Sequence, residues 1–297
     1  MRNSLRTVIL GLISAVLVVA AGLTPAAVAQ AVDPAVCGTP LSPDEVDTIA
    51  RLSDTGTLAG DALQRLEIAV ARHHEITEIL IAHRDRRGLF SLGLDGVEQL
   101  AVMPLQHDPG AFLDREYAHA ISLELLGRFL NNVHAAFTGA PVEPHWAQYF
   151  ELARRCAVSP ARVAMAGYNA HLTVDLAYSV ATVGSRPENA PDYFKIVDAI
   201  ATTGQVIVDR TKAIYNGDLG PLWRFYFVGE GLDLLLGAGV ATGPLLRAAD
   251  LGYNVVIYGN GLALEDPGLH AATAVEIRLL SDSVDVALDV LTLLRGL

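Results

Sequence analysis

Apolar residues recur at helical spacing along most of this chain, and this pattern constrains the fold more than any other feature. The stretch 58–87 is one example. Its apolar face carries Leu66, Ala69, His73, Ile76 and Leu80. Glycine and proline separate such stretches, as they commonly do at helix ends. Further helices are expected over residues 112–137, 160–183, 191–215, 221–236, 244–264 and 267–294.

The remaining segments give little sign of β-structure. Residues 88–111 are predicted to be a connector rich in glycine, aspartate and proline, with about two turns of helix around 97–105. The best strand candidate, Tyr253–Tyr258, lies between helical patterns without a strand to pair with, so we expect buried helix there. Ser42 and Ser159, each followed by proline, are predicted N-caps. The sequence therefore predicts an all-α fold, a single compact multi-helix bundle with a short N-terminal arm.

The first residues have the organisation of a secretory signal peptide. Arg2 and Arg6 precede an uncharged apolar run, and small residues follow at 26–29. This order predicts cleavage after Ala29 and a secreted, extracellular product, with a retained membrane anchor as the alternative. The predicted organisation is a signal peptide over 1–29, an N-terminal arm over 30–57 and one all-helical domain over 58–297.

Charge and cysteine content restrict the partners. The formal net charge of −12 disfavours nucleic acid and anionic lipid surfaces, because both present phosphates. Charged residues interrupt every apolar run of the C-terminal half, so no stable membrane span is expected after signal cleavage. A small-molecule or lipid-like ligand remains compatible with this composition. Cys37 and Cys156 are expected to form a disulfide that ties the arm to the helical body.

The common cofactor and nucleophile motifs are missing. The sequence has no Walker loop, no G-x-G-x-x-G after a strand, no G-x-S-x-G and no H-E-x-x-H. No nucleotide or flavin cofactor is therefore indicated, and candidate chemistry has to come from polar side chains on otherwise apolar helices.

The most informative segment is 164–182, which is apolar nearly all round and is therefore predicted to be a buried helix. His171 and Asp175 lie one turn apart on one face of it. A buried carboxylate is costly unless it is paired or binds a cation. Three interpretations follow: a structural pair, an acid–base dyad in which Asp175 orients His171, and a site where both residues are metal ligands.

A second helix adds to the metal interpretation. Glu116 and His119 have E-x-x-H spacing, which presents two ligands from one helix in di-iron carboxylate bundles. His73, on an apolar helix face, is a further candidate. Zinc, iron or manganese are the divalent metals to expect with these donors. The alternative for each of these three residues is a satisfied core polar group or an exposed side chain.

One part of the sequence resembles a known family. The stretch Gly167–Leu176 is similar to the G-x-N-A-H-[IL]-x-x-D-L signature of an uncharacterised family, common in actinobacteria, that has no assigned activity. Trp146 with Phe150 resembles its W-x-x-x-F element. Residues 87–90 and 112–114 resemble its R-G-x-F and F-x-D pieces.

The resemblance spans about residues 58–215 and implies an all-α bundle, in agreement with the periodicity. It points to Asn169, His171 and Asp175 as the residues of interest. The expected function is a secreted enzyme centred on these three residues, metal-assisted or His/Asp acid–base, that hydrolyses a small or lipid-like extracellular substrate. The alternatives are a non-catalytic carrier with an apolar groove lined by residues 225–264 and a structural envelope protein.

Overall fold

The computed structural model describes residues 32–220 and 242–295 of the chain. The predicted signal peptide over 1–29, the predicted helix over 221–236 and part of the predicted groove lie outside these residues. Within the described part all regular secondary structure is helical and no strand occurs, which confirms the all-α prediction.

The helices and their bounds follow the sequence pattern in most places. In chain order they are α1 (Pro43–Leu52), α2 (Ala62–Ala82), α3 (Leu89–Val97), α4 (Met103–His107), α5 (Arg115–Thr138), α6 (Pro144–Arg154), α7 (Pro160–Asn169), α8 (Leu176–Thr182), α9 (Ala190–Thr203), α10 (Gln205–Tyr215), α13 (Thr242–Glu265) and α14 (His270–Arg295). Two π-helical segments, η3 (Glu98–Val102) and η4 (Ala170–Asp175), interrupt the α-helical course. The candidate strand at 253–258 lies inside α13, as predicted.

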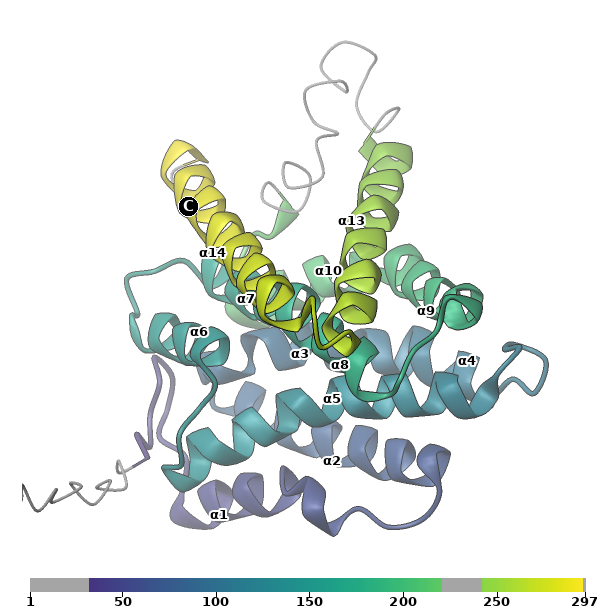
Figure 1. Cartoon of the computed structure of the whole chain (residues 1–297). Helices are drawn as coiled ribbons and strands as arrows, with labels where there is room; N and C mark the ends of the chain where they lie inside the picture. The colour runs from purple at the N-terminus through teal and green to yellow at the C-terminus, as the bar shows by residue number, and fades with distance from the viewer. Residues whose placement is uncertain (1–31, 221–241, 296–297) are drawn as a thin grey trace, which may run out of the picture.

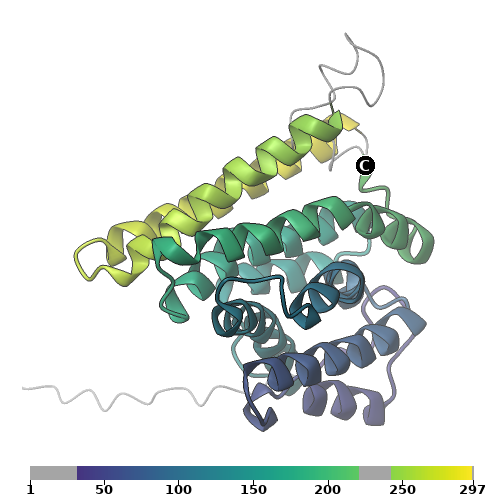
Figure 2. The ribbon, with the colours of Figure 1, turned by 90° about the vertical axis from the view of Figure 1, so that its right-hand side faces the viewer.

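The helices pack in layers (Figures 1 and 2). On one side, α1 and α2 pack against α5. In the middle, α3 contacts α7 and α10. On the opposite side, α13 and α14 form a hairpin that covers α8, α9 and α7. The long central α5 and the segment from α7 to α8 therefore lie between two outer layers, where a buried site can be enclosed.

The sequence signals for helix starts hold at both predicted N-caps. Ser42 Oγ accepts a hydrogen bond from the backbone N–H of Glu45, and the backbone N–H of Ser42 donates to the Glu45 carboxylate, which forms a capping box at α1. Ser159 accepts from the backbone N–H of Arg162 at the start of α7. Both caps precede a proline at the first helical turn, the position where its missing N–H has no helical partner.

Two sequence expectations about helix boundaries are wrong. Residues 88–111 are mostly helical, because the apolar side chains of Leu89, Phe90 and Leu92 are fully buried and packing outweighs the low helix propensity of the glycines. The single helix expected over 191–215 is two helices, with Gly204 between α9 and α10. Gly204 is the local signal for this break, since glycine is unfavourable in a helix interior.

An aromatic cluster forms the centre of the main hydrophobic core. Phe90 lies 5.2 Å from Trp146 and 4.9 Å from Phe129 between ring centroids, and Tyr149 lies 5.6 Å from Trp146. All four side chains are fully buried. Aromatic pairs at such distances and inclined angles are among the more favourable core contacts, so the cluster holds α3, α5 and α6 together.

The N-terminal arm is fastened to the helical body. Cys37 and Cys156 form the expected disulfide. The backbone of the arm pairs with the end of α2, since Thr39 donates to the His83 carbonyl at 2.9 Å and Arg86 donates to the Val36 carbonyl at 3.0 Å. Separately, none of the described helices has the length and apolar character needed to span a membrane.

We expect the Cys37→Ser/Cys156→Ser double variant to lose about 2–5 kcal/mol of unfolding free energy. The physical reason is that the disulfide bridges a sequence separation of 119 residues and so restricts the unfolded chain. Urea unfolding followed by far-UV circular dichroism measures the loss. An unchanged midpoint would show that the backbone contacts hold the arm without the disulfide.

Candidate functional site

The carboxylate of Asp175 is the centre of the candidate site. Asp175 ends the π-helical segment η4 and is fully buried. Its Oδ1 accepts a hydrogen bond from His145 Nε2 at 2.8 Å, and its Oδ2 accepts one from Trp146 Nε1 at 2.8 Å. Two neighbouring residues at the start of α6 thus bind the two oxygens of one carboxylate. Single turns of π-helix occur often at functional sites.

His171 lies on the other side of this carboxylate. Its Nδ1 is 3.6 Å from Asp175 Oδ2, too far for a good hydrogen bond, and it is a buried atom without a hydrogen-bond partner among the described residues. Its ring lies 5.0 Å from that of Phe90 between centroids. The predicted burial of the His171–Asp175 pair is confirmed, with 3% and 0% exposure. A buried polar atom without a partner requires an explanation, and a bound ion is one of the accepted ones.

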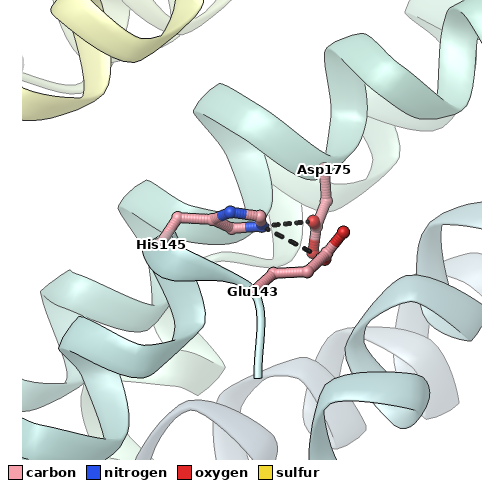
Figure 3. A group of neighbouring side chains, drawn as sticks. All are labelled: Glu143, His145 and Asp175. Carbon is pink, nitrogen blue, oxygen red and sulfur yellow. Dashed lines mark hydrogen bonds and ion pairs between the residues drawn. The ribbon is translucent and has the colours of Figure 1, made fainter. Parts of the chain in front are cut away.

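Glu143 completes the site on the solvent side (Figure 3). Its Oε2 lies 3.7 Å from His145 Nε2, so both carboxylates face the same imidazole nitrogen. Asn132 of α5 fixes Glu143, because its Nδ2 donates to Oε2 at 2.8 Å and its Oδ1 accepts from the Glu143 backbone at 2.9 Å. The side chain of Glu143 is 50% exposed and that of His145 is 16% exposed, so the site has one open side.

The charges around Asp175 favour its ionised form. Burial alone would raise the pKa of this carboxyl. The hydrogen bond from His145 and the nearby imidazole of His171 outweigh burial and hold the pKa of Asp175 below its ordinary value. The buried carboxylate is therefore an anion at neutral pH, and it attracts a hydrogen-bond donor or a cation.

The set Glu143, His145 and Asp175 has the composition of a metal site. One ligand atom from each of these residues lies within 4.8 Å of the others, and among the described residues no other group of three or more offers this. The donors are one imidazole nitrogen and two carboxylate oxygens, which suit zinc and other divalent first-row metals.

The structure does not bring His73 into this site. Its Nδ1 is hydrogen-bonded to Glu98 Oε2 at 2.6 Å and its Nε2 to Ser91 Oγ at 2.7 Å. Thr77 Oγ1 lies 2.6 Å from the same serine oxygen. His73 and Ser91 are both 0% exposed. The arrangement has the order of a Ser–His–acid triad but gives no substrate access, so we interpret it as a link between α2, α3 and η3.

Glu116 and His119 also remain apart from Asp175. Glu116 is exposed to solvent. His119 is buried and its Nδ1 is hydrogen-bonded to Gln106 Oε1 at 2.6 Å. Burial, together with the charge of Arg115, lowers the pKa of His119, so it is a neutral core residue. Residues 116 and 119 are three positions apart on α5, but only one of them faces the interior.

Asn169 belongs to a different buried network. Its Nδ2 donates to the Ser281 carbonyl at 2.9 Å and to Asp285 Oδ2 at 3.0 Å, both on α14. Arg162 Nη2 donates to the same Asp285 at 3.0 Å. Of the three residues of the predicted catalytic set, the structure therefore brings His171 and Asp175 together. It uses Asn169 to join α7 to α14.

Sequence reasoning missed Glu143 and His145. Both lie at the start of a short helix, in Glu143-Pro144-His145-Trp146, where helical periodicity has too few turns to assign a buried face. The available signal was the position of a histidine directly before Trp146, the tryptophan of the W-x-x-x-F element.

The pieces that carried the family resemblance lie close together. Phe90 packs against His171, and Trp146 bonds to Asp175. Gly167 permits this arrangement, since a Cβ there would lie 2.5 Å from the Cβ of Phe90. The glycine is therefore required by the close approach of α3 and α7.

The fold and the site define an all-helical protein with a buried carboxylate that accepts hydrogen bonds from a tryptophan and a histidine and has a second histidine beside it. Residues 66–229 match the model of the Family of unknown function (DUF5995), which is more than half of the chain. The chain belongs to this family, which confirms the expected membership of an uncharacterised family. Comparison with the curated proteins and with solved structures gives no significant match.

The contact of Gly167 with Phe90 gives a stability prediction. We expect Gly167→Ala to lower the unfolding free energy by about 1–3 kcal/mol, because the added methyl group overlaps the Phe90 side chain in a packed core. Thermal and urea unfolding measure the change. Gly127→Ala on α5, where a Cβ meets nothing within 4 Å, is the control and should be neutral or stabilising.

The α7–α14 network gives a pH prediction. Burial, the largest effect, raises the pKa of Asp285 above its ordinary 3.8, although Arg162 and Asn169 lower it. The folded protein thus holds this proton more tightly than the unfolded chain, and the resulting stabilisation is complete below pH 3.8 and lost as the pH rises through the raised pKa. Wild type should therefore lose stability relative to Asp285→Asn as the pH rises from 3.8 through the raised pKa of Asp285. Urea midpoints across this range test it, and a difference that grows in the opposite direction would contradict it.

Proposed function

We propose that this protein is a metal-assisted hydrolase whose centre is formed by Glu143, His145 and Asp175. The observation that carries the proposal is the convergence of these three ligand atoms within 4.8 Å, on the one side of the buried carboxylate that is open to solvent. Catalytic zinc sites commonly have three protein ligands and keep a fourth position for water.

The distances are compatible with a bound ion after small movements. Two ligands of a tetrahedral zinc ion lie roughly 3.3–3.6 Å apart, given bond lengths of about 2.0–2.2 Å. His145 Nε2 is 2.8 Å from Asp175 Oδ1 and 3.7 Å from Glu143 Oε2, so the two spacings bracket this range. Binding replaces the hydrogen bond between His145 and Asp175, which requires that Nε2 lose its proton.

The surroundings hold the proposed ligands in place. Trp146 binds the oxygen of Asp175 that does not face His145, and Asn132 binds Glu143. Hydrogen bonds of this kind orient carboxylate ligands in metal sites. The unpartnered Nδ1 of His171, 3.6 Å from Asp175, adds a buried imidazole beside the site.

The chemistry that fits this centre is hydrolysis. A divalent ion held by Glu143, His145 and Asp175 would lower the pKa of a water molecule and so supply a nucleophile for the carbonyl carbon of an ester. Water would add its oxygen to the acyl group and its proton to the departing alcohol, so that the products are a carboxylic acid and an alcohol. A small or lipid-like ester is the proposed substrate class. The signal sequence expected over 1–29 and the Cys37–Cys156 disulfide support the proposal that this activity acts outside the cytoplasm.

Elemental analysis of the purified protein after zinc reconstitution tests the proposal first. Wild type should hold about one equivalent of metal and His145→Gln less than about a tenth of that, because the variant loses the only imidazole among the three ligands. Glu143→Gln should weaken binding. Glu116→Gln is the matched control, the same change at an exposed acid outside the site.

Activity on p-nitrophenyl esters of increasing chain length is the second readout. Hydrolysis should stop on chelation, return with zinc and fall about 100-fold or more in His145→Gln, while Ser91→Ala remains active. Absence of metal from reconstituted wild type, or equal metal in wild type and His145→Gln, would rule the centre out. Metal without hydrolysis of any ester would leave a binding protein in which the ion is structural.

A further inference from the structure

A second feature, independent of the proposed centre, is a half-open pocket of about 320 Å³ beside α5. It lies between the middle of α5, the beginning of α2 and the end of α8. Its volume is within the range of small-molecule sites. Its lining is polar at some positions and apolar at others, so the pocket suits a ligand with two chemically different ends.

The polar part of the lining consists mainly of hydrogen-bond donors. Arg65 is exposed and makes no ion pair with any described residue. Arg128 Nη2 bonds to Thr182 at 2.8 Å and pairs with Glu124 at 2.9 Å, but its Nε is buried and has no hydrogen-bond partner within the described residues. Asn131 Oδ1 accepts from Thr55 at 2.6 Å, which leaves its Nδ2 as a donor.

The exposed guanidinium of Arg65 is the second observation that indicates a ligand, since it forms no ion pair within the described residues whereas the buried Nε of Arg128 has no surface that an acceptor in the pocket can reach. A cationic donor gains most from a charged acceptor. The one carboxylate in the lining, Glu124, is already paired with Arg128 through Nη2. Arg65 therefore has free hydrogen-bond donors that an anion in the pocket can bind.

The rest of the lining is apolar. Leu58 is partly buried and Leu123 is almost fully buried. Val183 lies at the end of α8. Gly127 also faces the pocket, where a Cβ would meet nothing within 4 Å. The space is therefore bounded by short aliphatic groups, which favour an alkyl chain over a second charged group.

We propose that this pocket binds a small amphipathic carboxylate, with the carboxylate at Arg65 and Arg128 and an alkyl chain along Leu58, Leu123 and Val183. The net charge of −12 does not oppose this, because charges farther away than about 8–10 Å are largely screened at physiological ionic strength while the two guanidinium groups act directly. A ligand with a single negative charge and a short tail matches both parts of the lining.

Isothermal titration calorimetry with octanoate, acetate and 1-hexanol tests the proposal on the whole protein. Octanoate should bind with one site and a Kd of about 0.1–1 mM, a value set by its small size. Acetate lacks the tail and hexanol lacks the charge, so each should bind at least tenfold more weakly. Equal binding of octanoate and hexanol would show an apolar site without anion recognition and would overturn the proposal.

Variants at the pocket complete the test. Gly127→Leu should abolish octanoate binding, since its side chain fills open space and leucine favours helix over glycine. Gly127→Ala is the matched control and should still bind. Arg65→Gln should weaken binding about three- to tenfold, and Arg51→Gln, at an exposed arginine on α1 outside the pocket, should not change it.

Unchanged octanoate affinity in both Gly127→Leu and Arg65→Gln would refute the site. If Gly127→Leu fails to fold, Arg65→Gln alone decides the outcome. Weaker octanoate binding in this variant supports the site, and unchanged binding refutes it. The outcome is separate from that of the metal centre, because neither the ligand titration nor the pocket variants depend on bound zinc.

Discussion

The buried charge of Asp175 is the constraint on which the surrounding structure depends. An ionised carboxylate with no exposed surface is stable only if both oxygens have partners. The partners here come from the first turn of α6, where His145 and Trp146 bind one oxygen each. These two hydrogen bonds fix the position of the first turn of α6 against η4. Asn132 then ties the same turn to α5 through Glu143.

A similar arrangement occurs a second time on the other side of the aromatic cluster. Glu98 begins the π-helix η3 and pairs with His73, as Asp175 ends the π-helix η4 and pairs with His145. Phe129 contacts the rings of both His73 and Trp146 and so lies between the two. The two histidine–carboxylate pairs differ in their exposure to solvent. The His73–Glu98 pair is closed to solvent, whereas Glu143 and His145 keep the Asp175 site open on one side.

Much of the helical fold could be predicted because it depends on local pattern. The apolar face of α2, the caps at Ser42 and Ser159 and the stop near Gly184 are all encoded within a few residues. The prediction failed where packing overrode local preference, as at Leu89–Leu92, and where one glycine divided a regular pattern, as at Gly204. The disulfide was predictable because Cys37 and Cys156 are the only cysteines.

For the site, the sequence by itself determined that His171 and Asp175 are buried together, since a helix apolar on nearly every face has no other place for them. It could not determine the partners of that carboxylate. Spacing identifies neighbours only within one helix, and Glu143 and His145 reach Asp175 from a different element about thirty residues earlier in the chain. Only packing sets the distances between helices. Tertiary structure alone therefore decided that Glu116, His119 and His73 lie away from Asp175. It also decided that the start of the short helix α6 supplies the open side of the site.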